Sequence, residues 1–253
     1  MKPKISLFTS LFKGAAHLKG FLDDIEGQTI FKECELVIIG ANSPEKEEEE
    51  AILQPYLKRH RGHGNGLIRY LSLDHDPGVY AVWNLCIKEC SSDLLSNANV
   101  DDRKHPEHLE KHYEALQASP DADLAYADVA VTNKPNETFE RNSALFVQNF
   151  PEYSFLNLLK CNMPHNNPVW RSSIHEKNGY FKEDMISASD FDMWLRAATN
   201  GSKFKKVSGV LSLYYKNPEG ISTKGETLDE AVAEVVKLRE EYAYKVDYRE
   251  LSL

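Results

Sequence analysis

The chain has 253 residues, 42% of them hydrophobic, which is enough for one large α/β domain or two small ones with a buried core. Its 39 acidic residues outnumber its 30 basic residues, and the net charge of -9 argues against general binding to nucleic acid or to an anionic membrane, because both are polyanions. The N-terminus lacks the apolar region of a signal peptide, and no later apolar run reaches membrane-spanning length. We therefore expect a cytoplasmic protein with no membrane span and no nucleic-acid partner.

The first hundred residues repeat a strand-then-helix pattern three times. Apolar strands are expected at 5–9, 36–39, 67–73 and 94–95, and helices follow the first three of them. The acidic run 45–50 begins the second helix, where negative charge suits the helix dipole, and a solvated face explains it better than a binding role. This pattern is typical of half a doubly wound sheet, whose strand ends share one ligand-binding edge.

Two adjacent carboxylates, Asp101 and Asp102, follow the fourth strand at this edge. Their repulsion is tolerated most readily around a cation, and Mg²⁺ or Mn²⁺ prefers carboxylate oxygens together with those of a phosphorylated substrate. Taken alone, however, such a pair is more often a solvated acidic turn. The four cysteines show no zinc-type pairing, and their apolar surroundings predict reduced, buried thiols.

The second half of the chain has a different character. We expect helices after Pro106 and at 152–160, strands at 124–131, from Val169, at 204–207 and at 210–215, and a turn at 178–181. The segment 162–168 is dense in hydrogen-bonding side chains, which favours recognition of a hydroxyl-rich molecule. An amphipathic helix at 228–242 is expected to pack either across the domain or against a partner, such as a second copy in a homodimer.

Asp190 stands at the start of a helix whose apolar stripe includes Phe191, Trp194 and Leu195. There the helix dipole favours the ionised carboxylate, which is the form a general base must take. From the spacing alone, an ordinary helix N-cap is the commoner explanation, since Asp is among the preferred capping residues.

Several short stretches occur in a fixed order along residues 4–223. They are Thr9-Ser10, Asn42-Ser43, Gly78 to Asn84, Asn99-Val100-Asp101-Asp102 with Pro106, Gly179 to Glu183, and Ser189-Asp190-Phe191-Asp192-Met193-Trp194-Leu195-Arg196. Their order and spacing resemble the inverting glycosyltransferases of family 2. In that family the fourth stretch reads Asp-Ser-Asp-Asp…Pro and holds metal and diphosphate. The last reads Glu-Asp-x-Asp-x-Trp-x-Arg, and its second residue is the catalytic base.

The resemblance implies the nucleotide-sugar-binding fold called GT-A, an α/β domain with a mainly parallel, mixed central sheet flanked by helices and a Rossmann-like N-terminal half. It places a glycosyltransferase domain at 1–225, with a donor half at 1–104 and an acceptor half at 105–225, before a helical tail at 226–253. It implies metal-dependent transfer of a hexosyl-type sugar with inversion, using Mn²⁺ or Mg²⁺. The donor is a nucleotide-sugar, UDP-linked by default, and the acceptor is a carbohydrate, lipid-linked or protein hydroxyl.

The same resemblance assigns the site residues. Asp190 is the base, and Asp101 and Asp102 hold the metal, which leans on Asp102 while Asp101 lies nearer the ribose. The donor-binding residues are Thr9, Ser10, Asn42, Ser43, Asp76, Asn84, Asn99 and Asp101, and the acceptor-binding residues are His165, Asn166 and Trp194.

The sequence also departs from the family pattern. Gly40-Ala41 replaces two aspartates of the nucleotide loop, Asn99 replaces the first aspartate of the acidic motif, and Ser189 replaces the glutamate before the base. These changes fit either a divergent enzyme or a non-catalytic relic that binds a nucleotide-sugar, and we favour the enzyme because the three key carboxylates are present. A metal-dependent phosphohydrolase is a further alternative, suggested by Asp74-His75-Asp76 and by His105 and His108 near the acidic pair. Against it, these histidines flank a helix of surface type.

Overall fold

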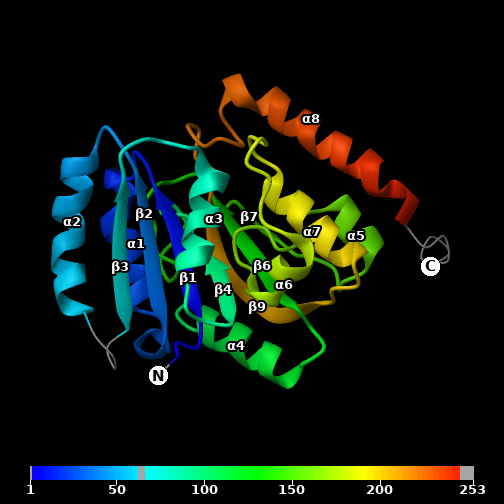
Figure 1. Cartoon of the computed structure of the whole chain (residues 1–253), viewed down its shortest axis with the longest axis horizontal. Coiled ribbons are helices and arrows are strands. Elements are labelled where there is room, and N and C mark those ends of the chain that lie inside the picture. The colour runs from blue at the N-terminus through cyan, green and yellow to red at the C-terminus, as the bar shows by residue number, and fades with distance from the viewer. Residues whose placement is uncertain (1, 62–65, 246–253) are drawn as a thin grey trace.

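One mixed sheet organises the molecule (Figure 1). The computed structural model describes residues 2–61 and 66–245, and within them nine strands run in the order β3-β2-β1-β4-β8-β6-β9-β5, with β7 paired to β6. The strands are β1 Ser6–Leu11, β2 Glu35–Ala41, β3 Leu67–Leu73, β4 Leu94–Asn97, β5 Arg103–Lys104, β6 Leu124–Thr132, β7 Phe146–Gln148, β8 Val169–Arg171 and β9 Phe204–Tyr215. The helices are α1 Ala15–Glu26, α2 Lys46–Arg59, α3 Val79–Glu89, α4 His108–Ala118, α5 Phe155–Lys160, α6 Ser173–Asn178, α7 Ser189–Thr199 and α8 Gly225–Tyr242, with 3₁₀ turns at Phe31–Glu33 and Ala243–Lys245.

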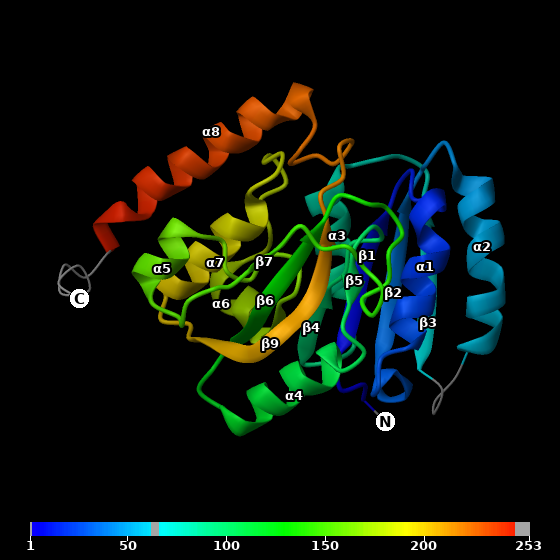
Figure 2. The same cartoon turned by 180° about the vertical axis from the view of Figure 1, so that it is seen from behind.

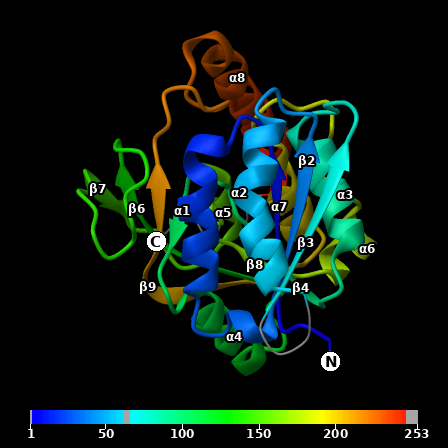
Figure 3. The same ribbon diagram turned by 90° about the vertical axis from the view of Figure 1, so that its left-hand side faces the viewer.

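The N-terminal half is the predicted half of a doubly wound sheet. Strands β3, β2, β1 and β4 are all parallel, and every residue of β2 is buried, as expected of a central strand covered on both faces. Apolar stripes of α1, α2 and α4 pack on one face of the sheet, while α3 and α5–α7 cover the other (Figures 1 and 3). This packing brings the loops after β1, β2, β3 and β4 to one edge.

The C-terminal half joins this sheet by antiparallel pairing. Strand β8 lies antiparallel between β4 and β6, and β9 runs parallel to β6 and antiparallel to β5. The sequence predicts two strands at 204–207 and 210–215, but they are one strand. Its pairing with β6 shifts where Ala127 faces Val207 and the next residue, Asp128, faces Val210. Gly209 has a φ of +100°, a conformation that L side chains rarely adopt, so a glycine permits this irregularity.

Three short elements, β5, β7 and α6, are not predicted from the sequence, because two or three residues of strand or six of helix carry no clear periodicity. The glycine- and histidine-rich stretch 60–66, whose composition predicts a turn, lies partly outside the described residues. The acidic run of α2 is also not entirely solvated, because Glu49 is buried and accepts hydrogen bonds from Gly14 N (2.8 Å) and Ser43 Oγ (3.1 Å).

Helix α8 crosses the outside of the domain beside α5 and α7 (Figures 1 and 2). Its inner face buries Leu238 and Tyr242 in the same core as α7, and Arg239 donates to the carbonyl oxygens at the end of α5. Its outer face leaves Leu228, Val232 and Val236 exposed. Pairing of two copies through this face stays a prediction. No helix within the described ranges is both long enough and apolar enough to span a bilayer.

Candidate active site

The acidic turn joins β4 to β5 at the ligand-binding edge of the sheet. Asp102 is buried, and its carboxylate accepts hydrogen bonds from Tyr215 N of β9 (3.0 Å) and Asn99 Nδ2 (3.1 Å). Burial, together with the negative charge of Asp101, raises the pKa of this carboxyl. Asp102 therefore fastens the turn to the end of β9, and both of its oxygens already have protein donors.

Asp101 is more open than its neighbour. Its side chain is partly exposed, and its Oδ2 accepts a hydrogen bond from Asn217 Nδ2 at 3.0 Å. The carboxylate with more exposure is therefore Asp101, whereas the resemblance implies a metal that leans on Asp102, and which of the two holds a metal stays a prediction. Asn99 also differs from its predicted role, since its side-chain amide is used to hold Asp102.

A buried cation lies behind the acidic turn. Lys104 is 4% exposed, and its Nζ donates to the backbone carbonyl of Asn166 at 3.4 Å. Burial lowers the pKa of Lys104 to about 8, while the charge of Asp102 acts in the opposite direction. The Asn166 side chain accepts from Ser212 Oγ at 2.9 Å. Asn166 is buried at the base of the site.

Asp190, the predicted general base, lies in the first turn of α7. The N-cap of this helix is Ala188, so Asp190 is the second helical residue and not the cap that spacing alone favours. Its Oδ2 accepts a hydrogen bond from Asn162 Nδ2 at 2.8 Å, and burial raises the pKa of Asp190 to about 6. A carboxyl with this pKa is ionised at neutral pH yet basic enough to take a proton.

The segment 162–168 borders both carboxylate positions. At one end, Asn162 holds Asp190, and further along, the His165 ring lies 4.9 Å from the Tyr214 ring between their centroids. Tyr214 immediately precedes Tyr215, whose N–H binds Asp102. Burial is the main cause of the raised pKa of Tyr214, and the negative charges of Asp102 and Asp101 add to it. Residues nearly ninety positions apart therefore flank one short loop.

The turn before α7 is held from two directions. Asn84 of α3 is buried, donates to Phe181 O (2.9 Å) and Glu183 Oε1 (2.9 Å), and accepts from Phe181 N (3.0 Å). From α7, the fully buried Asp192 pairs with Lys182 (2.8 Å) and Arg196 (2.6 Å). The predicted donor contact at Asn84 is therefore wrong, because this amide is used to position the turn.

Replacement of Asn84 with Ala should destabilise the fold. It leaves the buried N–H and C=O of Phe181 without partners, which costs about 1–3 kcal/mol for an unsatisfied buried group. Urea unfolding should show this loss, whereas the same change at the exposed surface residue Asn149 should cost less than about 0.5 kcal/mol. If the urea midpoint of the Asn84→Ala variant is unchanged, the hydrogen bonds between Asn84 and Phe181 contribute no stability.

Trp194 is a second correction. It is 1% exposed and packs at 5.1 Å from Trp170 and 6.0 Å from Phe181 between ring centroids. A side chain enclosed in this aromatic core offers no surface to an acceptor. His165 keeps some exposure within the segment 162–168, and its predicted contact with the substrate stays a prediction.

The other residues predicted to bind the sugar donor lie at the carboxyl edge of the sheet, and they differ in how exposed their side chains are. Thr9 is buried near the end of β1, with Ser10 partly exposed beside it, while Asn42 and Asp76 are exposed in the loops after β2 and β3. Ser43 is buried, and its Oγ accepts from Lys13 N (2.9 Å) and Glu45 N (3.1 Å), so it ties two loops together. Sequence reasoning assigned no role of their own to Tyr80, which lies in the stretch Gly78 to Asn84, or to Asn162, which begins the segment 162–168, and it missed Asn217 altogether.

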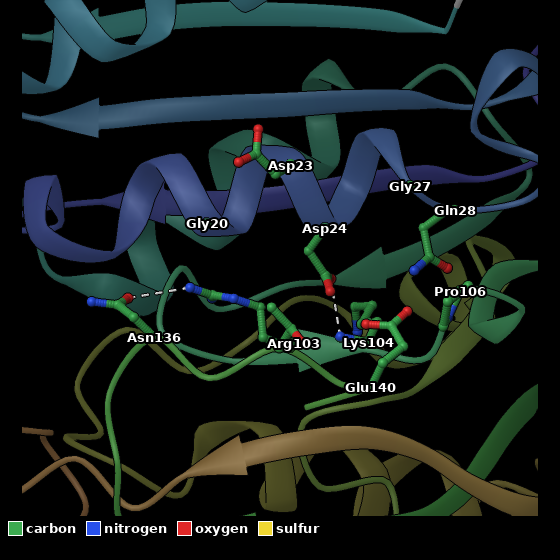
Figure 4. A pocket seen from close by; sticks show the side chains of 11 residues that line it. Gly20, Asp23, Asp24, Gly27, Gln28, Arg103, Lys104, Pro106, Asn136 and Glu140 are labelled. Atoms are coloured by element: carbon green, nitrogen blue, oxygen red, sulfur yellow. Dashed lines mark hydrogen bonds between the residues drawn. The ribbon is translucent and has the colours of Figure 1, made fainter. Parts of the chain in front are cut away.

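A hollow of about 220 Å³ lies on the other side of β5, between α1 and the segment around Asn136 (Figure 4). Asp24 Oδ2 accepts from Lys104 N at 3.0 Å there, and Arg103 reaches Asn136. Neither Asp101 nor Asp190 lines this hollow, so it is separate from the candidate active site.

Within the described residues, no group of three or more His, Cys, Asp or Glu side chains is arranged to hold a metal ion by itself. His108 is fully buried, with its ring Nδ1 at 3.2 Å from Leu211 O, and is not part of a surface helix face. The ligand set of a two-metal phosphohydrolase is therefore missing from this part of the chain.

The chain is thus an α/β domain with an acidic turn at the carboxyl edge of its sheet and a second carboxylate across a polar loop. The chain belongs to glycosyl transferase family 2, whose model matches residues 6–178. Asp190 lies beyond the matched residues.

Known proteins agree with this assignment. The chain is 25% identical over 214 residues to the uncharacterized glycosyltransferase YwdF of Bacillus subtilis, covering 83% of this chain and 74% of the relative. Its fold is similar to S. aureus TarS 1-349 in complex with UDP-GlcNAc (TM-score 0.74, 18% identity, 98% of this chain and 68% of that chain). It is also similar to the mannosyltransferase PcManGT of Pyrobaculum calidifontis in complex with GDP-Man and Mn²⁺ (TM-score 0.66, 13% identity, 94% and 65%). The GT-A fold is confirmed, and the chain spans about two thirds of these two solved chains.

Proposed function

We propose that this glycosyltransferase moves a sugar from a nucleotide-sugar donor to an acceptor hydroxyl with inversion, with Asp190 as the general base and Asp101 on the diphosphate side. The observation that carries the proposal is the segment 162–168, which contacts Asp190 through Asn162 and borders the acidic turn through His165 and Tyr214. The donor complexes of the two similar structures support a nucleotide-sugar, and UDP is the nucleotide we test first.

The acidic turn suits a divalent cation. Mg²⁺ and Mn²⁺ are commonly held by one or two carboxylates together with substrate phosphates, rather than by a full protein cage. The partly exposed Asp101 carboxylate, with the buried Asp102 beside it, matches such a donor set. When bound there, the cation would offset the negative charge that develops on the departing diphosphate.

Asp190 then acts on the acceptor. As the acceptor hydroxyl oxygen attacks the anomeric carbon, its proton passes to the Asp190 carboxylate, and the electron pair of the breaking C–O bond remains on the diphosphate. Attack opposite the leaving group gives inversion without a covalent intermediate. The Asn162 amide donates to Oδ2 of this carboxylate and so helps to orient it for proton transfer.

The pKa of Asp190 predicts the acid limb of the rate profile. Because the base must be ionised, kcat/KM should be constant well above pH 6 and fall about tenfold per pH unit below it. Transfer rates measured from pH 4.5 to 8 at low donor concentration test this. A limb near the ordinary Asp pKa of about 4 would mean that the protein does not raise the pKa of the base.

Two measurements test the proposed function. Thermal shift with a panel of nucleotide-sugars and Mn²⁺ should reveal the donor, since ligand at 100 times its Kd stabilises the fold by about 2.7 kcal/mol. Incubation of this donor with carbohydrate, lipid-linked and protein acceptors should then yield a product of inverted anomeric configuration by NMR. Donor binding with no transfer or donor hydrolysis would instead favour the non-catalytic relic.

A further inference from the structure

Glu234, in the middle of α8, binds the backbone just before α7. Its Oε1 accepts a hydrogen bond from Ile186 N (2.6 Å), and its Oε2 accepts from Ser187 N (2.9 Å) and Ala188 N (2.9 Å). Three consecutive N–H groups therefore converge on one carboxylate. The helix that carries it lies beyond the residues matched by the family model.

The segment 186–188 is also held from the opposite side. Tyr80, the second residue of α3, donates its hydroxyl to Ser187 O at 2.6 Å. The backbone that enters α7 thus lies between α3 and α8, which approach it from different parts of the fold (Figures 1 and 2). Ala188 is the N-cap of α7, and Asp190 follows two residues later.

We propose that Glu234 is a positioning residue for sugar transfer, which fixes the entry of α7 so that the Asp190 carboxylate stays aimed at the acceptor site. This inference rests on the proposed role of Asp190. Hydrogen bonds to an ionised carboxylate are about twice as strong as neutral ones, so three of them restrain a loop well. A displacement of about 1 Å between a catalytic group and its substrate can lower a rate a hundredfold.

Glu234 also acts on Asp190 through its charge. The titratable groups that face Asp190 are Tyr80 from α3 and Glu234 from α8, and the neutral Asn162 faces it from the loop before β8. Burial is the main cause of the raised pKa of Asp190, and the negative charge of Glu234 adds to it. Loss of this charge and any greater exposure of Asp190 would both lower the pKa, so the expected direction is unambiguous.

Steady-state kinetics of Glu234→Ala and Glu234→Gln test the inference, with Glu230→Gln as the control on an exposed position of the same helix. The Ala variant should lose about tenfold in kcat with unchanged nucleotide affinity, and the acid limb of kcat/KM should move to lower pH in both Glu234 variants. The control should match the unmodified protein. The Gln variant, which keeps the side-chain volume and one acceptor oxygen, serves if the Ala variant does not fold.

Hydrogen exchange of the backbone amides of 186–188 tests the contact without any activity measurement. Exchange should be faster in Glu234→Ala than in the unmodified protein, and the control should leave it unchanged. Faster exchange with the same kcat and the same acid limb would reduce Glu234 to a structural contact and overturn the inference. The proposed function fails separately if Asp190→Asn retains full turnover. A slow Asp190→Asn with a fully active Glu234→Ala refutes only the positioning role.

Discussion

Replacing Asp190 with Asn should lower the rate of sugar transfer by roughly 10²–10⁴-fold, the usual contribution of a general base. The amide is nearly the same size as the carboxylate, and its oxygen can still accept the hydrogen bond from Asn162. It cannot take the proton of an acceptor hydroxyl. Nucleotide affinity, measured by calorimetry, should change little because our proposal puts the donor diphosphate on the Asp101 side of the loop.

Asp184→Asn is the matched control. Asp184 lies in the same turn, six residues before Asp190, but its side chain is exposed. The two variants remove the same charge, so a rate loss confined to Asp190→Asn would reflect proton transfer and not net charge. Equal turnover of the Asp190 variant and the unmodified protein would remove Asp190 from the mechanism.

Replacing Asp101 with Asn should weaken Mn²⁺-dependent binding of a nucleoside diphosphate by about a hundredfold. Even changes to residues that only support metal ligands cost 10–100-fold in metal affinity, and Asp101 is the partly exposed carboxylate of the pair. Calorimetry with and without Mn²⁺ separates this effect from metal-independent contacts to the nucleotide. Asp121→Asn, at an exposed surface site paired with Lys203, should leave binding unchanged.

The Asp102→Asn variant distinguishes the two carboxylates. Both carboxylate oxygens of Asp102 accept hydrogen bonds, one from Tyr215 N and one from Asn99 Nδ2. In Asp102→Asn one of these oxygens becomes an NH₂ group that cannot accept a hydrogen bond, so the change should chiefly lower the melting temperature. If instead Asp102→Asn abolishes Mn²⁺-dependent binding while Asp101→Asn does not, the metal leans on Asp102, as the family resemblance implies.

The sequence predicts the N-terminal fold well because its signals are local. A continuous apolar run such as 36–39 predicts a strand buried on both faces, and an apolar stripe such as that of Leu18 and Phe21 predicts a helix with one buried face. The alternation of strands and helices then predicts that the strands are parallel. Strand β9 is less predictable, since Gly209 interrupts its pattern and only pairing with β6 shows that the chain continues as one strand.

For the site, the sequence predicts the region better than the roles. Asp101 and Asp102 follow β4 and Asp190 begins α7, but their burial and partners differ, because both depend on residues distant in the chain. The same reason explains the errors at Asn84 and Trp194, whose partners come from other helices. Glu234 has no motif of its own, so its contact with the start of α7 appears only in three dimensions.

The most direct measurement is a crystal structure of the protein with Mn²⁺ and a non-hydrolysable nucleotide-sugar. Our account predicts the metal and diphosphate at Asp101, with the anomeric carbon turned toward Asp190 across the segment 162–168. A donor bound in the hollow beside Asp24, or a sugar separated from Asp190 by that segment, would contradict it.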